Sequence, residues 1–318
     1  MTIRHSIVMI CYNQEKYIRI ALDSVLCEEV KPYEIIIGDD FSTDGTRNIL
    51  LEYKNRYPEI LKLVFNEKNL GIVANANNVA PKATGDVIHF LSGDDWFRPK
   101  FLANMNKKIF DLNIDPHTVR FILVPHTVYH YVDSTEKTIR NNPKLIEQFS
   151  PVGLLFRGML FHRQVGLSRA LFDRWPLFPS DSDDIGLWAD LVQLAMLTQH
   201  VETIAIIDSE GPVYRAGVGI VSKAKSSELA RSYHAALVRI HSYSLSGDIR
   251  LNSADAQYLE FLIDCWSVFL GKNQKTIIAI IREAFVLIYN NIREIRPIAK
   301  LFFYLLRRTI VRLIKPSL

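Results

Sequence analysis

A continuous run of apolar residues that ends in two adjacent acids is the strongest constraint on the fold. Residues 87–96 read VIHFLSGDDW, so a β-favouring segment leads directly into Asp94 and Asp95. A run of this kind, bounded by turn residues, is typical of a strand that is buried on both faces of a sheet. Open α/β sheets bind their ligands at the carboxyl ends of such strands. The two acids are therefore predicted to lie at a ligand-binding edge, although a solvated turn also explains the same residues.

Two carboxylates that lie side by side need a positive partner, because burying like charges together is costly. A divalent cation such as Mg²⁺ or Mn²⁺ accepts carboxylate oxygens and also bridges phosphate groups. Asp94 and Asp95 are therefore predicted to be metal ligands, with Mg²⁺ or Mn²⁺ as the cofactor.

Strand and helix patterns alternate through the first third of the chain. Continuous apolar runs predict strands at residues 6–13, 34–39 and 61–65, before the strand at 87. Apolar residues at helical spacing separate these runs, which favours a parallel sheet with helices on both faces. The second strand ends at Asp39 and Asp40, so a second acid pair is predicted at the same edge.

The later part of the chain gives fewer signals. It contains an extended stretch at 119–132, a strand near 203–207 and a Gly-rich segment at 211–222 that reads as a loop. Asp183 and Asp184 open an apolar helix, where an ordinary N-cap explains either acid. From residue 226 the pattern is helical, so we expect one domain at 1–225 and a helical region at 226–318.

Taken together, these segments resemble the family 2 glycosyltransferases. The likeness covers roughly residues 7–222 and is most specific at residues 35–46, IIIGDDFSTDGT, where Phe41 stands at a position that is usually small. The resemblance implies the GT-A fold, a mixed, mostly parallel Rossmann-like sheet flanked by helices, here with a C-terminal helical extension. No G-x-G-x-x-G or Walker loop is present, which counts against dinucleotide oxidoreductases and P-loop enzymes.

The resemblance also implies roles for individual residues. The residues expected to bind the donor nucleotide are Tyr12, Asp39, Asp40, Asn69, Asn77, Asp94 and Arg215. The second acid of Asp183–Asp184 falls on the family's catalytic base, which gives that role to Asp184. The sequence departs from the family where Ser92 replaces a usual acid and where no His follows Arg215.

The implied activity is metal-assisted, inverting transfer of one sugar from a nucleotide-sugar donor. The acceptor is expected to be a hydroxyl of a glycan or a lipid-linked molecule in cell-envelope polysaccharide biosynthesis. The motif of processive polymerases is absent, so a single, non-processive transfer is expected. Two alternatives remain open: a catalytically inactive sugar-nucleotide-binding or scaffold protein, and a sugar-phosphate nucleotidyltransferase.

Charge and cysteine content bear on location and partners. The chain has 318 residues, a net charge of +4 and three cysteines far apart, which fits a reducing cytoplasm and no zinc site. The segment 276–318 carries eight basic residues against two Glu, and its basic side chains lie opposite an apolar face. It is expected either to bind the anionic inner face of the cell membrane or to dock on the catalytic domain. Nucleic acid is not an expected partner, because the rest of the chain is mildly acidic.

Overall fold

The structure is a computed structural model of the 318-residue chain. It describes residues 3–115, 117–118, 120–123, 126–130, 133–140, 150–156, 165–174, 187–201, 203–207 and 211–270. The chain separates into two compact units, Met1–Ala224 and Lys225–Leu318. Asp183, Asp184 and the basic segment 276–318 lie outside the described residues, so the roles given to them stay predictions.

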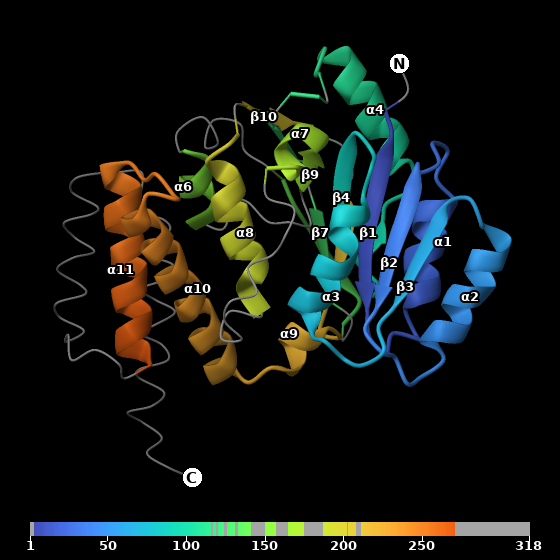
Figure 1. The fold of residues 1–318 in the computed structure, drawn as a ribbon, viewed down its shortest axis with the longest axis horizontal. Coiled ribbons are helices and arrows are strands. Elements are labelled where there is room, and N and C mark those ends of the chain that lie inside the picture. Colours follow the sequence, from blue (N-terminus) through green and yellow to red (C-terminus); the bar gives the residue numbers. More distant parts are fainter. Residues whose placement is uncertain are drawn as a thin grey trace, which may run out of the picture. The chain divides into compact units, whose positions relative to one another are not determined.

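Within the described residues, the larger sheet of the first unit has the strand order β10-β6-β9-β4-β1-β2-β3 (Figure 1). The strands are β1 (His5–Cys11), β2 (Glu34–Asp39), β3 (Leu61–Phe65), β4 (Val87–Ser92), β6 (Arg120–Leu123), β9 (Val165–Ser168) and β10 (Thr203–Ile206). β1, β2, β3 and β4 form parallel pairs, as do β6 and β10, whereas β9 runs antiparallel to β4 and β6. The predicted mixed, mostly parallel sheet is confirmed.

Helices cover both faces of this sheet (Figure 1). The described helices of the first unit are α1 (Ile18–Leu26), α2 (Thr46–Arg56), α3 (Ile72–Val79), α4 (Phe101–Asp111), α6 (Pro151–Phe156), α7 (Arg169–Phe172), α8 (Ala189–Thr198) and α9 (Ile220–Lys223), with a 3-10 turn η1 (Ala80–Lys82) after α3.

The two faces of β1 and β2 contact different helices because alternate residues point to opposite sides of a strand. Ile35 and Ile37 pack in one buried cluster with residues of α1, α2 and α4. Gly38 faces the other way, where a Cβ would lie 2.4 Å from the Asn75 side chain of α3. Strands buried on both faces explain why the sequence reads there as continuous apolar runs.

The strand order reverses beside β1, because the chain adds β2 and β3 on one side and places β4 on the other. In open α/β sheets, a ligand usually binds at such a reversal, in the crevice outside the carboxyl ends of the strands. The loops that follow β1, β2 and β4 are therefore the first place to look for a site.

A second sheet of the first unit has the strand order β5-β11-β7-β8. Its described strands are β5 (Trp96–Phe97), β7 (His126–His130), β8 (Thr135–Ile139) and β11 (Pro212–Ala216). Two predictions need correction here. The extended stretch at 119–132 is two strands in different sheets, and the predicted loop at 211–222 contains β11, whose backbone pairs with β5 and β7.

Within the second unit, the structure describes α10 (Ser226–Ser246) and α11 (Ser253–Phe269). Gly247 ends α10 with a φ of 88°, a left-handed conformation that glycine adopts without strain. Among the residues that the structure describes, no helix has the length and the apolar character needed to cross a membrane.

Candidate functional site

Three strands of the larger sheet end side by side. Cys11 at the end of β1 pairs with Asp39 at the end of β2, and Ile10 pairs with Ser92 at the end of β4. The residues that follow these strands therefore meet at one edge, which brings both predicted acid pairs to the same side of the sheet.

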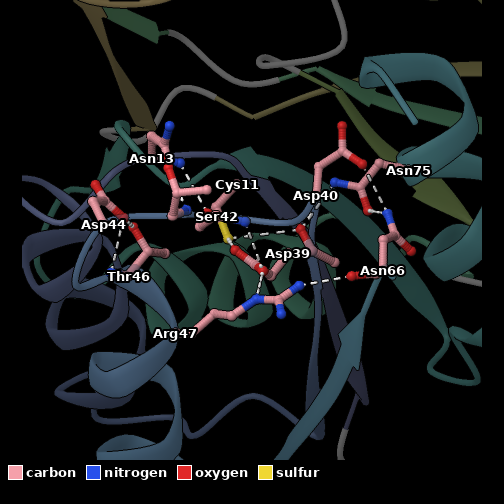
Figure 2. A network of polar contacts seen from close by, with 12 residues as sticks. Cys11, Asn13, Asp39, Asp40, Ser42, Asp44, Thr46, Arg47, Asn66 and Asn75 are labelled. Carbon is pink, nitrogen blue, oxygen red and sulfur yellow. Dashed lines mark hydrogen bonds and ion pairs between the residues drawn. The ribbon is translucent and has the colours of Figure 1, made fainter. Parts of the chain in front are cut away.

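Asp39 is fully buried at this edge, with none of its surface exposed. Its Oδ2 accepts hydrogen bonds from the Nε of Arg47 and from the backbone N–H of Ser42. Figure 2 shows Arg47 reaching from the first turn of α2 to Asp39, and its Nη2 also donates to the carbonyl oxygen of Asn66 over 2.7 Å. A buried carboxylate needs such a partner, and the sequence did not identify Arg47 as that partner.

Two aromatic rings flank the guanidinium of Arg47. Its Cζ lies 5.2 Å from the ring centroid of Phe41 and 5.2 Å from that of Phe65. These are cation–π distances. Phe41 is 40% exposed and Phe65 is 37% exposed, so the rings and the cation between them form part of the surface over Asp39.

Asp40 holds the loop that leads into α3. Its Oδ1 accepts the N–H of Leu70 and its Oδ2 accepts the N–H of Gly71, both at 2.8 Å. Gly71 has a φ of 84°, and a second acceptor for its N–H is Oδ1 of Asn69 at 3.2 Å. The two residues predicted to bind nucleotide, Asp40 and Asn69, thus both fix the conformation of this loop.

A cluster of side-chain amides joins this loop to the sheet (Figure 2). Nδ2 of Asn66 donates to Oδ1 of Asp40 and to Oδ1 of Asn75, at 2.9 and 3.0 Å. Nδ2 of Asn75 donates in turn to the carbonyl oxygen of Gly38 over 2.9 Å. Asn77 lies on the same helix and is half-buried. The sequence singled out Asn77 but missed Asn66 and Asn75, although Asn75 shares the buried face of α3 with Ala76 and Val79.

The loops after β1 and β2 are tied to each other. The N–H of Asn13 donates to Oγ of Ser42 at 2.9 Å, and the N–H of Thr43 donates to Oδ1 of Asn13 at 2.8 Å. Both Asn13 and Phe41 have positive φ angles, 51° and 63°. Tyr12 stands on the first of these loops and is 47% exposed, which leaves its ring open to solvent at the sheet edge.

The acid turn after β4 contains Asp94 and Asp95, both buried. Oδ1 of Asp95 accepts the backbone N–H of Arg215 on β11 at 2.8 Å, and Nε of Arg215 donates to the carbonyl oxygen of Asp94 at 2.8 Å. Burial raises the pKa of the Asp94 carboxyl, and the positive charges of Arg215 and Lys223 act in the opposite direction. Asp95 therefore joins the turn to the second sheet.

Arg215 was predicted to bind the donor nucleotide, and the structure places its guanidinium among three aromatic rings. Its Cζ lies 4.4 Å from the ring centroid of Trp96, 5.0 Å from that of Tyr17 and 5.8 Å from that of Tyr129. The residue is only 6% exposed. Its described contacts hold the acid turn in place.

Glycines allow the backbone to approach this turn closely. A Cβ on Gly93 would lie 2.2 Å from Oε1 of Gln14 and 2.8 Å from Cδ1 of Ile18, so a larger residue would displace these side chains. A Cβ on Gly219 would lie 3.1 Å from Oδ2 of Asp94. The close approach of Gly219 to the Asp94 carboxylate therefore favours a glycine, a feature that the sequence pattern alone did not reveal.

The residues present at the acid turn fit a divalent cation that is coordinated both by carboxylate oxygens and by a bound phosphate group. Mg²⁺ in such sites is usually held by one or two carboxylates together with substrate phosphates and water. Asp94 offers a buried carboxylate whose Oδ2 faces the backbone of Gly219. Among the described residues, no three His, Cys, Asp or Glu side chains come together as a metal-binding cluster. Phosphate oxygens would have to complete the coordination.

The chain matches known proteins over this region. Residues 6–161 match the model of glycosyl transferase family 2. The chain is 40% identical over 115 residues to an uncharacterised protein of Mycobacterium tuberculosis. The match covers 36% of this chain and 32% of that protein. It is 30% identical over 192 residues to an uncharacterised glycosyltransferase of Nostoc sp., or 58% of this chain and 56% of the relative. It is 38% identical over 96 residues to TuaG of Bacillus subtilis, named as a teichuronic acid biosynthesis glycosyltransferase, or 30% of this chain and 38% of TuaG. The chain spans about half or less of the length of these curated relatives.

Two solved structures show the same fold. TarS of S. aureus in complex with UDP-GlcNAc has a TM-score of 0.60 and 18% identity, and the match covers 90% of this chain and 80% of TarS. The mannosyltransferase PcManGT of Pyrobaculum calidifontis, in complex with GDP-Man and Mn²⁺, has a TM-score of 0.56 and 17% identity, with coverage of 100% and 89%.

The fold and the edge site define the class, an α/β protein with the GT-A fold. The particular family follows from the matched segment: residues 6–161 form a glycosyltransferase family 2 domain. The family and the fold that the sequence predicted are both confirmed.

Proposed function

We propose that this protein transfers a sugar from a nucleotide-sugar donor to a hydroxyl acceptor, with inversion and with one sugar added per encounter. The observation that carries the proposal is the meeting of Asp39 and Asp94 at the edge where the strand order reverses. Family membership supports it, as do the donors named in the solved structures of the same fold, UDP-GlcNAc in TarS and GDP-Man in PcManGT.

The donor would lie along the edge from β2 to β4. Its base would lie on the side of Tyr12 and the loop after β2, and its diphosphate would lie near Asp94. Arg215 and Lys223 contribute positive charge around Asp94, which favours a diphosphate there. Asp40, Asn69 and the amide cluster would keep the loop before α3 in shape, and we propose that Asn77 contacts the donor from that helix.

Asp94 would hold Mg²⁺ or Mn²⁺ together with the diphosphate, with Asp95 as the second predicted ligand. Such a cation neutralises the charge of the leaving diphosphate. The hydrogen bond from the backbone N–H of Arg215 to Asp95 would hold the acid turn in place, with Oδ2 of Asp94 beside Gly219.

The acceptor hydroxyl would approach from the opposite side of the sugar, where a carboxylate must take its proton. By the family likeness this general base is Asp184, with Asp183 beside it. Both precede Leu187 and Trp188, and Trp188 is the N-cap residue of α8. The acceptor would be a glycan or a lipid-linked molecule of the cell envelope, a class that fits the biosynthetic name of TuaG. The segment 276–318 would bring the enzyme to the inner face of the cell membrane.

A catalytically inactive sugar-nucleotide-binding protein is the second candidate. Ser92 favours it, because this residue stands where the family usually carries a further acid. An inactive protein would bind donor without turning it over.

The experiment that tests the proposal is an assay of nucleoside diphosphate release from a panel of nucleotide sugars with Mn²⁺ and candidate acceptors. Release that depends on acceptor and metal supports transfer. Metal-dependent binding without release across that panel would favour the inactive candidate. Asp184→Asn should lower turnover by roughly 10²–10⁴-fold and leave donor binding intact, with Asp183→Asn as the matched control.

A further inference from the structure

Two cations act on the carboxylate of Asp94, and they differ in what else they contact. The Arg215 guanidinium lies buried among three aromatic rings and donates its Nε–H to the carbonyl oxygen of Asp94. Lys223 is exposed, and among the residues that the structure describes no carboxylate forms an ion pair with it. Of these two cations, Lys223 therefore has its charge available to a ligand.

The backbone places Lys223 beside the acid turn. Gly219 comes so close to Asp94 that a Cβ on the glycine would lie 3.1 Å from Oδ2. The chain turns at Gly219, whose carbonyl oxygen accepts the backbone N–H of Ser222 at 3.1 Å and its hydroxyl at 2.6 Å. α9 then places Lys223 one helical turn beyond Gly219, and residues four apart lie on the same side of a helix. In Figure 1, α9 lies at the end of the first unit toward which β1 and β4 run.

The charge of Lys223 also reaches Asp94. Burial raises the pKa of the Asp94 carboxyl, and the positive charges of Arg215 and Lys223 oppose that rise. A lysine carries its charge on a flexible stem and has three N–H donors, so it can follow an anion that binds near Asp94. A phosphate oxygen is a strong acceptor for such a charged donor.

The proposed transfer creates new negative charge at this place. The bond between the anomeric carbon of the sugar and an oxygen of the terminal phosphate breaks, and its electron pair stays on that oxygen. The acceptor oxygen bonds to the anomeric carbon, and the proton of its hydroxyl goes to the general base. The terminal phosphate therefore leaves with one negative charge more than it carried in the donor. A cation aimed at that oxygen accelerates the step, because it binds the leaving group more tightly than the donor.

We propose that Lys223 is a catalytic residue, whose ammonium donates a hydrogen bond to the terminal phosphate as the sugar leaves. Arg215 then holds the acid turn in place, while Lys223 contacts the ligand. This inference rests on the proposed function, and it adds a residue that binds the product diphosphate more strongly than the intact donor.

Calorimetry with Mn²⁺ tests this difference in wild type and in Lys223→Gln, with UDP compared with UDP-GlcNAc and GDP with GDP-Man. The lost hydrogen bond between charged groups should weaken nucleoside diphosphate binding roughly tenfold. The intact sugar nucleotide lacks the extra charge, so its affinity should fall by less than about threefold. The turnover number kcat should fall roughly tenfold while KM changes less, since the contact strengthens as the bond breaks.

Three controls separate this role from a structural one. Lys223→Arg keeps the charge and should restore most of the difference between the two kinds of ligand. Lys82→Gln changes an exposed lysine of η1, shortly before the start of β4, and should leave both affinities unchanged. Because Lys223 is exposed, Lys223→Gln should leave the melting temperature unchanged.

Unchanged diphosphate affinity in Lys223→Gln would overturn the inference. An equal loss for the diphosphate and the sugar nucleotide would overturn it as well, because Lys223 would then not distinguish the leaving group from the donor. A wild-type protein that binds none of the four ligands would overturn the proposed function together with this inference, so the two failures are distinguishable.

Discussion

The role of Arg215 gives the sharpest prediction about how the acid turn is built. Arg215→Met keeps much of the side-chain volume but removes the charge and the Nε–H donor. The lost hydrogen bond from Nε to the carbonyl oxygen of Asp94 is charge-assisted and is worth about 1.5–3 kcal/mol. The lost cation–π contacts, of which the one to Trp96 at 4.4 Å is the shortest, add about 1–2 kcal/mol. We expect the free energy of unfolding to fall by about 3–4 kcal/mol.

Arg215→Lys is the matched control for charge. A lysine keeps the cation near Trp96 but cannot reproduce the planar Nε–H, so the expected loss is about half as large. Urea unfolding followed by tryptophan fluorescence is a suitable assay, because Trp96 lies directly against Arg215. A loss below about 0.5 kcal/mol for Arg215→Met would refute the positioning role. Unchanged stability with lost nucleotide binding would instead support the direct contact with the donor nucleotide that the sequence predicts.

Two further predictions concern stability. Glu28→Ala should lower the free energy of unfolding by about 1–2 kcal/mol in a urea titration, because the Glu28 carboxylate accepts the N–H groups of Phe101 and Leu102 at the start of α4. Glu29→Ala is the control: it removes an exposed ion pair with Lys100 and should leave the free energy of unfolding almost unchanged. Burial lowers the pKa of His5 to about 4 and that of His89 well below its ordinary value, so the unfolded chain binds protons that the folded chain does not. Stability should therefore fall as the pH drops from 6.5 toward 4, by roughly 3 kcal/mol for the His5 shift alone. A pH series of unfolding free energies that is equally steep in the wild type and in a His5→Gln/His89→Gln variant would contradict this.

Much of the edge site could be predicted from the sequence because its framework is set by local patterns. Continuous apolar runs place β1, β2 and β4, and the polar residues directly after each run must then lie at the carboxyl edge. Asp39, Asp40 and Asp94 were found in this way.

The partners of these residues could not be predicted, because they come from distant parts of the chain. Glu28 caps a helix 73 residues further on, and Arg215 meets Asp94 across 121 positions. Arg47 is the exception, because it lies only eight positions after Asp39; its contact depends on the turn between β2 and α2, which the apolar pattern does not define. The pairing of β11 with β5 and β7 is equally non-local, which is why residues 211–222 were read as a loop.

The most direct single test is a titration of nucleoside diphosphate into the protein with and without Mn²⁺. Wild type and Asp94→Asn are compared, with Asp111→Asn as the control, since Asp111 forms an exposed ion pair with Lys107 on α4, away from the acid turn. If the donor diphosphate shares a cation with Asp94, nucleotide binding should depend on Mn²⁺ in the wild type and in Asp111→Asn. The dependence on Mn²⁺ should be lost in Asp94→Asn. Equal metal-dependent affinity in all three proteins would contradict a donor site at the acid turn after β4.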